Sequence, residues 1–254
     1  MTSENYPLTV KTSLPTVWPL FKASLFFYWH HRWQILKAVS LPLALSVGLY
    51  FVTPIYLPLV PGLALMVLVG SYGFLSLTRL LMSSVPSANH NRIAYTRKHF
   101  WPLVGLVVIL KIIILGWLML LIVPGVMAAV YLSFSPFILL EKRAGYWLTL
   151  MASWEYVRRF WWAVLGRWLG MVIASALVLW LVYLPLVSLV VAWLVVVPLA
   201  VVYLYQIYLA LKRLKPELEV MPADSQRRRL WLAILLVVGL VSLLVMAYKP
   251  EFIK

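Results

Sequence analysis

Two kinds of residue are scarce in this sequence: it contains no cysteine, and its acidic residues number only 7. Without cysteine the chain forms no disulfide, no thiolate nucleophile and no thiolate-ligated metal site. All the acids lie outside the membrane spans predicted below, which argues against a proton relay through carboxylates in the membrane. No phosphate-binding glycine loop and no HExxH or GxSxG motif occurs. We therefore predict no catalytic residue, no metal and no cofactor.

Hydrophobic residues are abundant instead. They make up 64% of the chain, charged residues make up 11%, and the mean hydropathy is +0.96. A soluble domain could not hide so much apolar surface, because about half of a typical domain is apolar and about a quarter is charged. The composition therefore predicts a multi-pass integral membrane protein.

Long apolar stretches predict the membrane spans. About 20 apolar residues are needed, because a helix that rises about 1.5 Å per residue must cross roughly 30 Å of hydrocarbon. Seven stretches qualify, at residues 35–57, 62–82, 103–123, 126–140, 164–184, 186–211 and 230–248. In the short fourth stretch we expect Pro136 to bend the helix, while the hydroxyls of Ser133 and Ser135 cover a freed carbonyl. The predicted fold class is all-α, a polytopic membrane helix bundle.

The distribution of basic residues predicts the orientation. Nearly all of the 22 Lys and Arg residues lie before the first span or in the connections that follow the second, fourth and sixth spans. By the positive-inside rule these segments are cytoplasmic, so the N-terminus lies inside and the seventh span puts the C-terminus outside a bacterial cytoplasmic (inner) membrane. The net charge of +15 is then a topology signal, and no nucleic-acid partner is predicted.

Four regions follow from this topology. Residues 1–34 form a cytoplasmic N-terminus without a signal-peptide pattern. Within it, residues 21–33 are predicted to form an amphipathic aromatic helix in the headgroup layer, with Lys22 and Arg32 toward phosphate. Residues 35–211 form the six-span membrane domain, residues 212–229 a basic cytoplasmic linker, and residues 230–254 the seventh span with a short external tail.

The first six spans are predicted to form three hairpins. Their external connections are short and contain the expected turn residues Pro58, Pro61, Pro124, Gly125 and Pro185. Residues 95–105 align with residues 156–166, and in both copies a turn proline follows the final glycine by 19 residues. Biased composition at the inner interface is the alternative explanation for this similarity. With repetition, the bundle consists of three parallel two-helix hairpins plus a seventh C-terminal span.

The central third of the chain contains a recognisable pattern. Pro124-Gly125 follows an apolar helix, residues 131–141 read Tyr-Leu-Ser-Phe-Ser-Pro-Phe-Ile-Leu-Leu-Glu, and Ser153-Trp154, a basic aromatic stretch and Gly166 follow. This pattern resembles the YciC-like family of uncharacterised bacterial inner-membrane proteins, which is related to the membrane domain of glycerophosphodiester phosphodiesterases. The resemblance implies a six-helix inner-membrane protein with no established activity. The seventh span departs from the family, and nothing here resembles the phosphodiesterase catalytic domain.

Lys111 is a charged residue inside a predicted span. A lysine near the bilayer centre costs about 2.5 to 3.5 kcal/mol on insertion scales. It either snorkels to the nearer interface or faces the bundle interior and contacts an anionic headgroup or substrate. Most of the 13 tryptophans, with nearby bases, fall at the predicted cytoplasmic interface, which suits anionic headgroups, although simple anchoring is the alternative. The candidate lipid or anion contacts are Lys111, Arg97, Lys98, Arg158, Arg159, Trp101 and Trp162.

Gly166 and Gly170 form a small-xxx-small pair, which predicts close helix packing. The predicted function is non-enzymatic: an integral inner-membrane protein that binds or handles anionic lipid or a similar amphiphile at its cytoplasmic lip. The alternative is a structural or regulatory scaffold for a membrane protein partner. A transporter is the third hypothesis, weakened by the lack of intramembrane acids.

Overall fold

The computed structural model describes residues 14–56, 59–83, 92–142, 145–182, 185–215 and 233–242. All regular structure in these residues is helical, as the predicted all-α class requires. The elements in chain order are α1 (Val17–His30), α2 (Arg32–Tyr56), α3 (Leu59–Ser83), α4 (Arg92–Leu120), α5 (Ile122–Leu132), α6 (Ser135–Lys142), α7 (Tyr146–Arg158), α8 (Trp161–Leu181), α9 (Pro185–Val191), the π-helix η1 (Ala192–Val196) and α10 (Val197–Leu214). A further apolar helix spans Ala233–Ser242.

Five helical segments of the described chain are long and apolar enough to cross a membrane: Arg32–Phe51, Phe100–Leu118, Ile122–Lys142, Trp161–Leu181 and Pro185–Leu214. They coincide with five of the predicted spans. Shorter apolar helices, Val67–Leu81 and Ala233–Ser242, lie where the second and seventh spans are predicted. The fold is therefore compatible with a multi-pass membrane protein, and the count of seven spans stays a prediction.

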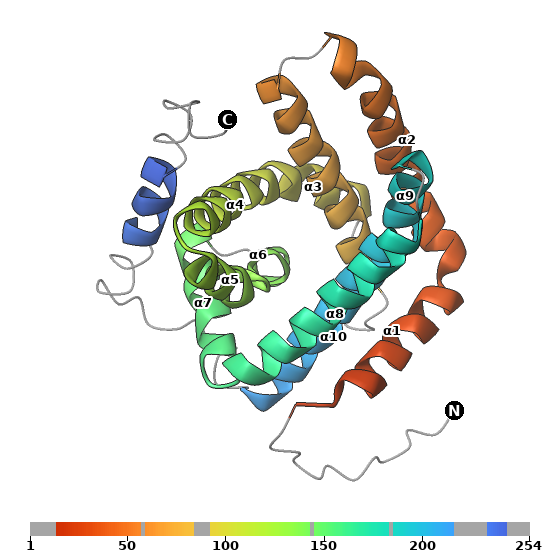
Figure 1. The fold of residues 1–254 in the computed structure, drawn as a ribbon. Helices are drawn as coiled ribbons and strands as arrows, with labels where there is room; N and C mark the ends of the chain where they lie inside the picture. Colours follow the sequence, from red (N-terminus) through yellow and green to blue (C-terminus); the bar gives the residue numbers. More distant parts are fainter. Residues whose placement is uncertain are drawn as a thin grey trace, which may run out of the picture.

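The core lies around α6, which sits near the middle of the molecule in Figure 1. Residues 135–140 of this short helix are all buried. Phe137 packs against the ring of Tyr208 from α10, with the ring centroids 6.0 Å apart. Leu140 belongs to a second apolar cluster with Leu106 of α4. Because α6 contributes to both clusters, it joins the half of the bundle that contains α4 to the half that contains α10.

The chain bends between α5 and α6, directly before Pro136, as predicted. The hydroxyl of Ser133 donates to the carbonyls of Ala129 and Val130 in the preceding turn, at 2.7 and 2.9 Å. The carbonyl that Pro136 leaves without its helical partner is that of Leu132, so the expectation that Ser133 covers it is not met. The same expectation is wrong for Ser135, whose buried hydroxyl forms no hydrogen bond to a described residue. Ser153 of α7 instead donates to the carbonyl of Tyr131 at 2.7 Å. A backbone carbonyl at the bend thus accepts a hydrogen bond from a neighbouring helix, as a membrane environment requires.

The connection between α4 and α5 differs from the prediction. It is the single residue Leu121, with an extended backbone at φ −152° and ψ 128°. Pro124 and Gly125, expected to form the turn, lie in the first turn of α5 instead. Gly125 has a different role, because a Cβ at this position would lie 2.6 Å from the backbone nitrogen of Leu118. A glycine here therefore lets α5 begin directly against the end of α4.

Two other predicted turn prolines lie at helix starts. Pro185 is the first residue of α9, and Pro61 lies in the first turn of α3. A proline suits these places because the first amides of a helix have no acceptor within it. Pro58 lies outside the described residues. Helices α2 and α3 pack together, as the first predicted hairpin requires. The Trp161–Leu181 segment, predicted to belong to the third hairpin, is only 6% buried. The plan of three hairpins therefore stays a prediction.

Two prolines inside the helices have their freed carbonyls covered by hydroxyls from other helices. A proline has no amide hydrogen, so the carbonyl four residues earlier loses its helical partner. The carbonyl four residues before Pro42 accepts a hydrogen bond from Ser76 of α3 at 2.9 Å. Pro198 leaves the carbonyl of Leu194 in η1 without its helical donor, and the hydroxyl of Tyr28 in α1 donates to this carbonyl at 2.9 Å. These bonds tie α2 to α3 and α1 to the η1–α10 helix.

Close packing occurs at other glycines than predicted. A Cβ on Gly166 or Gly170 would meet nothing within 4 Å, so the expected packing at this pair is not formed within the described chain. The physical reason is that α8 lies at the edge of the bundle, where few residues are buried. Gly116 of α4 and Gly239 of the helix Ala233–Ser242 meet backbone to backbone instead, because a Cβ on Gly116 would lie 2.2 Å from the carbonyl oxygen of Gly239.

Candidate functional site

An acidic side chain holds the ends of α6 and α10 together. Glu141 accepts a hydrogen bond from the hydroxyl of Tyr208 at 2.7 Å and forms an ion pair with Lys212. Tyr208 is fully buried, which fixes the position of its hydroxyl. Hydrogen bonds to an ionised group are roughly twice as strong as neutral ones. The carboxylate therefore fixes these two helix ends beside each other.

Lys215, at the end of α10, is a buried cation close to the connection between α7 and α8. Only 3% of the residue is exposed. Its ammonium donates to the carbonyl of Glu155 in α7 and lies 5.9 Å from the ring centroid of Phe160. A buried ammonium needs such partners because burial removes its hydration. The end of α10 is thereby fixed to the α7–α8 connection.

Arg167, in the second turn of α8, holds the segment that precedes α1. Its Nε donates to the carbonyl of Pro15 at 2.8 Å, and its Nη2 donates to the carbonyl of Leu14 at 3.0 Å. A further guanidinium nitrogen donates to the carbonyl of Ala163 in its own helix. Arg167 is partly buried, and no carboxylate of the described chain pairs with it. The guanidinium therefore has several hydrogen-bond acceptors, while no acid among the described residues neutralises its charge.

These contacts gather charged residues at one end of the bundle, here named the basic end. It comprises Glu141, Lys142, Glu155, Arg158, Arg159, Arg167, Lys212, Arg213 and Lys215. Arg158 lies 4.0 Å from Glu155, whereas Arg159 and Arg213 are exposed and have no acidic partner among the described residues. Trp162, which is 79% exposed, lies next to this charge at the start of α8. A surplus of bases beside exposed aromatic surface attracts anions and amphiphiles.

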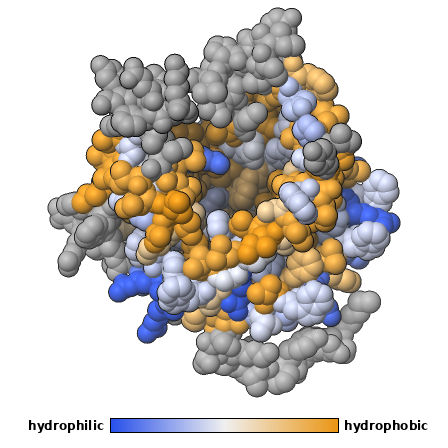
Figure 2. Space-filling view, in the orientation of Figure 1, coloured by the Kyte–Doolittle hydropathy of each residue, from blue (hydrophilic) through white to orange (hydrophobic). Residues whose placement is uncertain are grey.

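The surface of the molecule separates hydrophobic from hydrophilic residues. Figure 2 shows hydrophobic residues over most of this face, with hydrophilic residues gathered at its lower left edge and at its right side. The lower left edge is where α10 ends and α7 meets α8 in Figure 1. Figure 2 also shows a hollow at the centre of this face, bordered largely by hydrophobic residues. The basic end is thus set apart from the apolar body of the bundle.

Helix α1 presents a second face of aromatic and basic residues. Trp18, Lys22, Phe26 and Trp29 recur at a spacing of three or four residues and are all exposed, so they share one side of the helix. The ammonium of Lys22 lies 5.1 Å from the ring centroid of Trp18, and the guanidinium of Arg32 lies 5.1 Å from that of Trp29. Helix α1 begins earlier than predicted, at Val17, and ends at His30. Its place in the headgroup layer stays a prediction.

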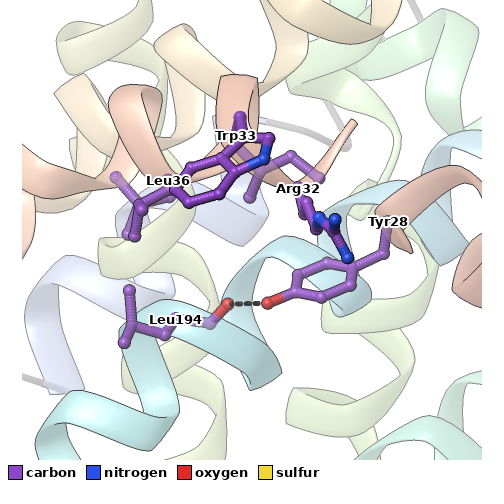
Figure 3. A pocket seen from close by; sticks show the side chains of 7 residues that line it. Tyr28, Arg32, Trp33, Leu36 and Leu194 are labelled. Carbon is purple, nitrogen blue, oxygen red and sulfur yellow. Dashed lines mark hydrogen bonds between the residues drawn. The ribbon is translucent and has the colours of Figure 1, made fainter. Parts of the chain in front are cut away.

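A small cavity lies where α1 meets α2 and η1. Its volume is about 180 Å³, and its walls include Tyr28, Arg32, Trp33, Leu36 and Leu194. Figure 3 shows the hydroxyl of Tyr28 pointing to the carbonyl of Leu194, with the guanidinium of Arg32 beside the tyrosine ring. Burial raises the pKa of the Tyr28 hydroxyl above its ordinary value of 10.0. At neutral pH the hydroxyl therefore keeps its proton and acts as the donor.

Two adjacent histidines, the last residue of α1 and the residue that follows it, pack against neighbouring phenylalanines. His30 stacks on Phe26, and His31 stacks on Phe27 with ring centroids 4.2 Å apart. Within the described part of the chain, no group of three His, Cys, Asp or Glu residues could hold a metal ion. His30 and His31 thus pack against aromatic rings, and Nδ1 of His31 also lies 3.2 Å from the carbonyl oxygen of Phe27.

The predicted lipid contacts are distributed over several elements. Lys111 is exposed on α4, on the same side as Trp101 and Leu115, whereas Leu103 and Leu106 line the buried side. The structure therefore leaves the ammonium of Lys111 accessible and does not bury it between helices. Trp101 is 67% exposed. Arg158 and Arg159 belong to the basic end, and Trp162 lies next to it. The side chains of Arg97 and Lys98 lie outside the described residues.

Sequence reasoning missed several residues that organise the site. Arg167 could have been identified from the sequence as a candidate site residue, because it lies inside the predicted span 164–184 with no acid nearby in the sequence. Pro42 and Pro198 indicate that two backbone carbonyls need hydrogen-bond donors from other helices. They do not indicate that these donors are Ser76 and Tyr28. The pairing of Tyr208 with Glu141 joins residues 67 positions apart, and no local pattern indicates it.

No protein-family model, curated protein or solved structure matches this chain. The resemblance to the YciC-like family therefore stays a prediction. The class that the fold defines is an all-helical protein with several apolar helices, compatible with an integral membrane protein.

Proposed function

We propose that this chain is a multi-pass protein of a bacterial inner membrane that binds anionic lipid, or a similar amphiphile, at its cytoplasmic lip, without enzymatic activity. The lip consists of the basic end and the aromatic face of α1. The observation that supports this most is the pairing of exposed tryptophan with bases that have no acidic partner among the described residues. Lys22 with Trp18 is the clearest example. Arg159 and Trp162 are both exposed and lie three residues apart where α8 begins.

The chemistry of these pairs suits a lipid headgroup. A tryptophan at the interface places its ring among the acyl chains and its N–H toward water. A neighbouring lysine or arginine contributes about 1 kcal/mol of attraction to an anionic membrane surface. An ordinary soluble interface would neutralise part of this charge with acids, whereas the exposed bases at this lip leave it available for phosphate.

Lys111 is the proposed contact outside the lip. Its accessible position on α4 allows its ammonium to reach a headgroup, either by snorkelling along the helix or across the surface of the bundle. Within the described chain no carboxylate pairs with it, so a lipid phosphate is the counterion that we propose.

The test is lipid analysis of the protein extracted directly into native-lipid nanodiscs. We expect one or more anionic lipids to be enriched around the wild type relative to the bulk membrane. Removing two unpaired bases, with Lys22→Gln and Arg159→Gln together, should reduce the enrichment severalfold, because each base contributes about a fivefold factor in affinity. Lys111→Leu should reduce it further.

Lys111→Arg is the matched control, because it keeps the charge and the length of the side chain. It should retain the wild-type lipid composition. If the wild type carries lipid in bulk proportions, the proposal is wrong. If Lys111→Leu and Lys111→Arg behave alike, Lys111 is not a lipid contact, whereas the proposal for the lip is unaffected.

One observation favours the scaffold as a second candidate function. Helix α8 is exposed along most of its length, with Ile173, Leu177 and Trp180 each more than half exposed. A partner helix could cover this apolar surface, as small and large apolar residues cover one another in membrane bundles. The nanodisc experiment distinguishes the two functions, because a scaffold would retain a protein partner in stoichiometric amount and lipid in bulk proportions.

A further inference from the structure

An apolar groove lies between α1, α8 and the η1–α10 helix. Its volume is about 190 Å³. The walls are formed by Phe21 of α1, Gly170, Ala174 and Val178 of α8, and Leu199 and Tyr203 of α10. Two of its three walls belong to segments long and apolar enough to cross a membrane. In a membrane the medium beside this groove is hydrocarbon.

Small residues of α8 create the groove. Gly170, Ala174 and Val178 are spaced by four residues, so they lie along one side of the helix for about 12 Å at a rise of about 1.5 Å per residue. A Cβ on Gly170 would meet nothing within 4 Å. Gly170 therefore does not serve close helix packing within the described chain. Because it has no side chain, the groove beside it stays open.

A cation that has no acidic partner among the described residues lies at one end of this groove. Arg167 precedes Gly170 and Met171 by three and four residues, which places it on the same side of α8. It also holds Leu14 and Pro15, just before Val17, another residue of the groove wall. Arg167 also interacts electrostatically with Tyr203, which lines the groove. No carboxylate of the described chain neutralises the guanidinium, as noted above.

A long apolar groove with a cation at one end is complementary to an anionic amphiphile. The buried hydroxyl of Tyr203, which has no hydrogen-bond partner among the described residues, adds a polar atom near the charged end. We infer that this groove binds one acyl chain of an anionic phospholipid, with the headgroup phosphate beside Arg167. The inference rests on the proposed function and assigns it a specific site, which the lip by itself does not provide.

Native mass spectrometry of the full chain reconstituted with phosphatidylglycerol or with phosphatidylcholine tests the site. The wild type should retain one phosphatidylglycerol more tightly than phosphatidylcholine. Gly170→Leu should weaken this binding at least tenfold, because the new side chain fills the groove. Gly166→Leu is the matched control: it makes the same change one turn earlier, at a position with open space that does not line the groove, and should bind as the wild type does.

The charge is tested separately. Arg167→Gln should lower the preference for phosphatidylglycerol over phosphatidylcholine about fivefold, and Arg167→Lys should keep it, because the lysine restores the charge. If Gly170→Leu does not fold, Ala174→Leu fills the same groove one turn further along α8.

The outcomes separate this inference from the proposed function. A wild type that shows no preference for phosphatidylglycerol contradicts the proposed function and the groove together. A wild type that binds phosphatidylglycerol, with Gly170→Leu unchanged, overturns the groove alone. Loss of a dimer rather than of lipid in Gly170→Leu would show that a second copy of the chain occupies the groove, which also overturns the inference.

Discussion

At the scale of single residues, hydroxyl groups from other helices replace the amide hydrogens that prolines lack. In water such a freed carbonyl would be solvated, but inside a membrane it costs several kcal/mol when left alone, by the general magnitude of about 2 to 7 kcal/mol for a buried unpaired polar group. Tyr28 meets this need for Leu194, and Ser76 meets it four residues before Pro42. Each proline thus creates a specific contact between helices.

Tyr28→Phe should destabilise the protein by about 1 to 3 kcal/mol, because it leaves the carbonyl of Leu194 unsatisfied. In a Pro198→Ala background the cost should be smaller, since the new amide of residue 198 can donate to that carbonyl. Unfolding in one detergent, followed by circular dichroism, measures the coupling in a double-mutant cycle. Tyr50→Phe, at an exposed tyrosine of α2, is the control. Equal costs in the two backgrounds would show that the hydroxyl does not replace the missing amide.

At the scale of elements, glycines decide which helices approach closely. Gly116 and Gly239 bring α4 and the helix Ala233–Ser242 into backbone contact, and Trp117 adds a hydrogen bond from its indole nitrogen to the carbonyl of Leu235 at 3.0 Å. Gly166 and Gly170, which do form a small-xxx-small pair, have open space beside them. The signature describes what a helix surface permits, whereas the partner depends on where the helix lies in the bundle.

Gly116→Leu should therefore separate α4 from the helix Ala233–Ser242 and destabilise the protein by about 1 to 3 kcal/mol, the usual cost of overpacking. Gly48→Leu, where a Cβ meets nothing within 4 Å, is the matched control and should be neutral or slightly stabilising, because leucine has the higher helix propensity. Thermal unfolding in detergent compares them. A Gly116→Leu variant as stable as Gly48→Leu would contradict this contact.

At the scale of the whole molecule, the basic end and the α4–α5 connection should face opposite sides of the membrane. The absence of cysteine makes the chain suitable for single-cysteine labelling. Leu121→Cys, at an exposed turn, should react with a membrane-impermeant maleimide on intact cells, and Arg159→Cys should react only after the membrane is permeabilised. Labelling of Arg159→Cys on intact cells would reverse the proposed orientation, and labelling of both would contradict the span between them.

The sequence by itself determined the helical class, five of the apolar segments and the bend before Pro136. These follow from local rules, because helix length, hydropathy and proline chemistry depend on neighbouring residues. It also named Arg158, Arg159 and Trp162 as candidate lipid contacts, and the structure leaves all three exposed, although their role as contacts stays a prediction.

Only the tertiary structure decided which groups meet. The pair Glu141 and Tyr208, the hold of Arg167 on the segment before α1, and the crossing at Gly116 and Gly239 join residues far apart in the chain. The groove at Gly170 exists for the same reason. In a chain so uniformly apolar, many helix faces are equally able to pack, so the few polar groups that must find partners and the positions without side chains select one arrangement, and that selection depends on three-dimensional placement.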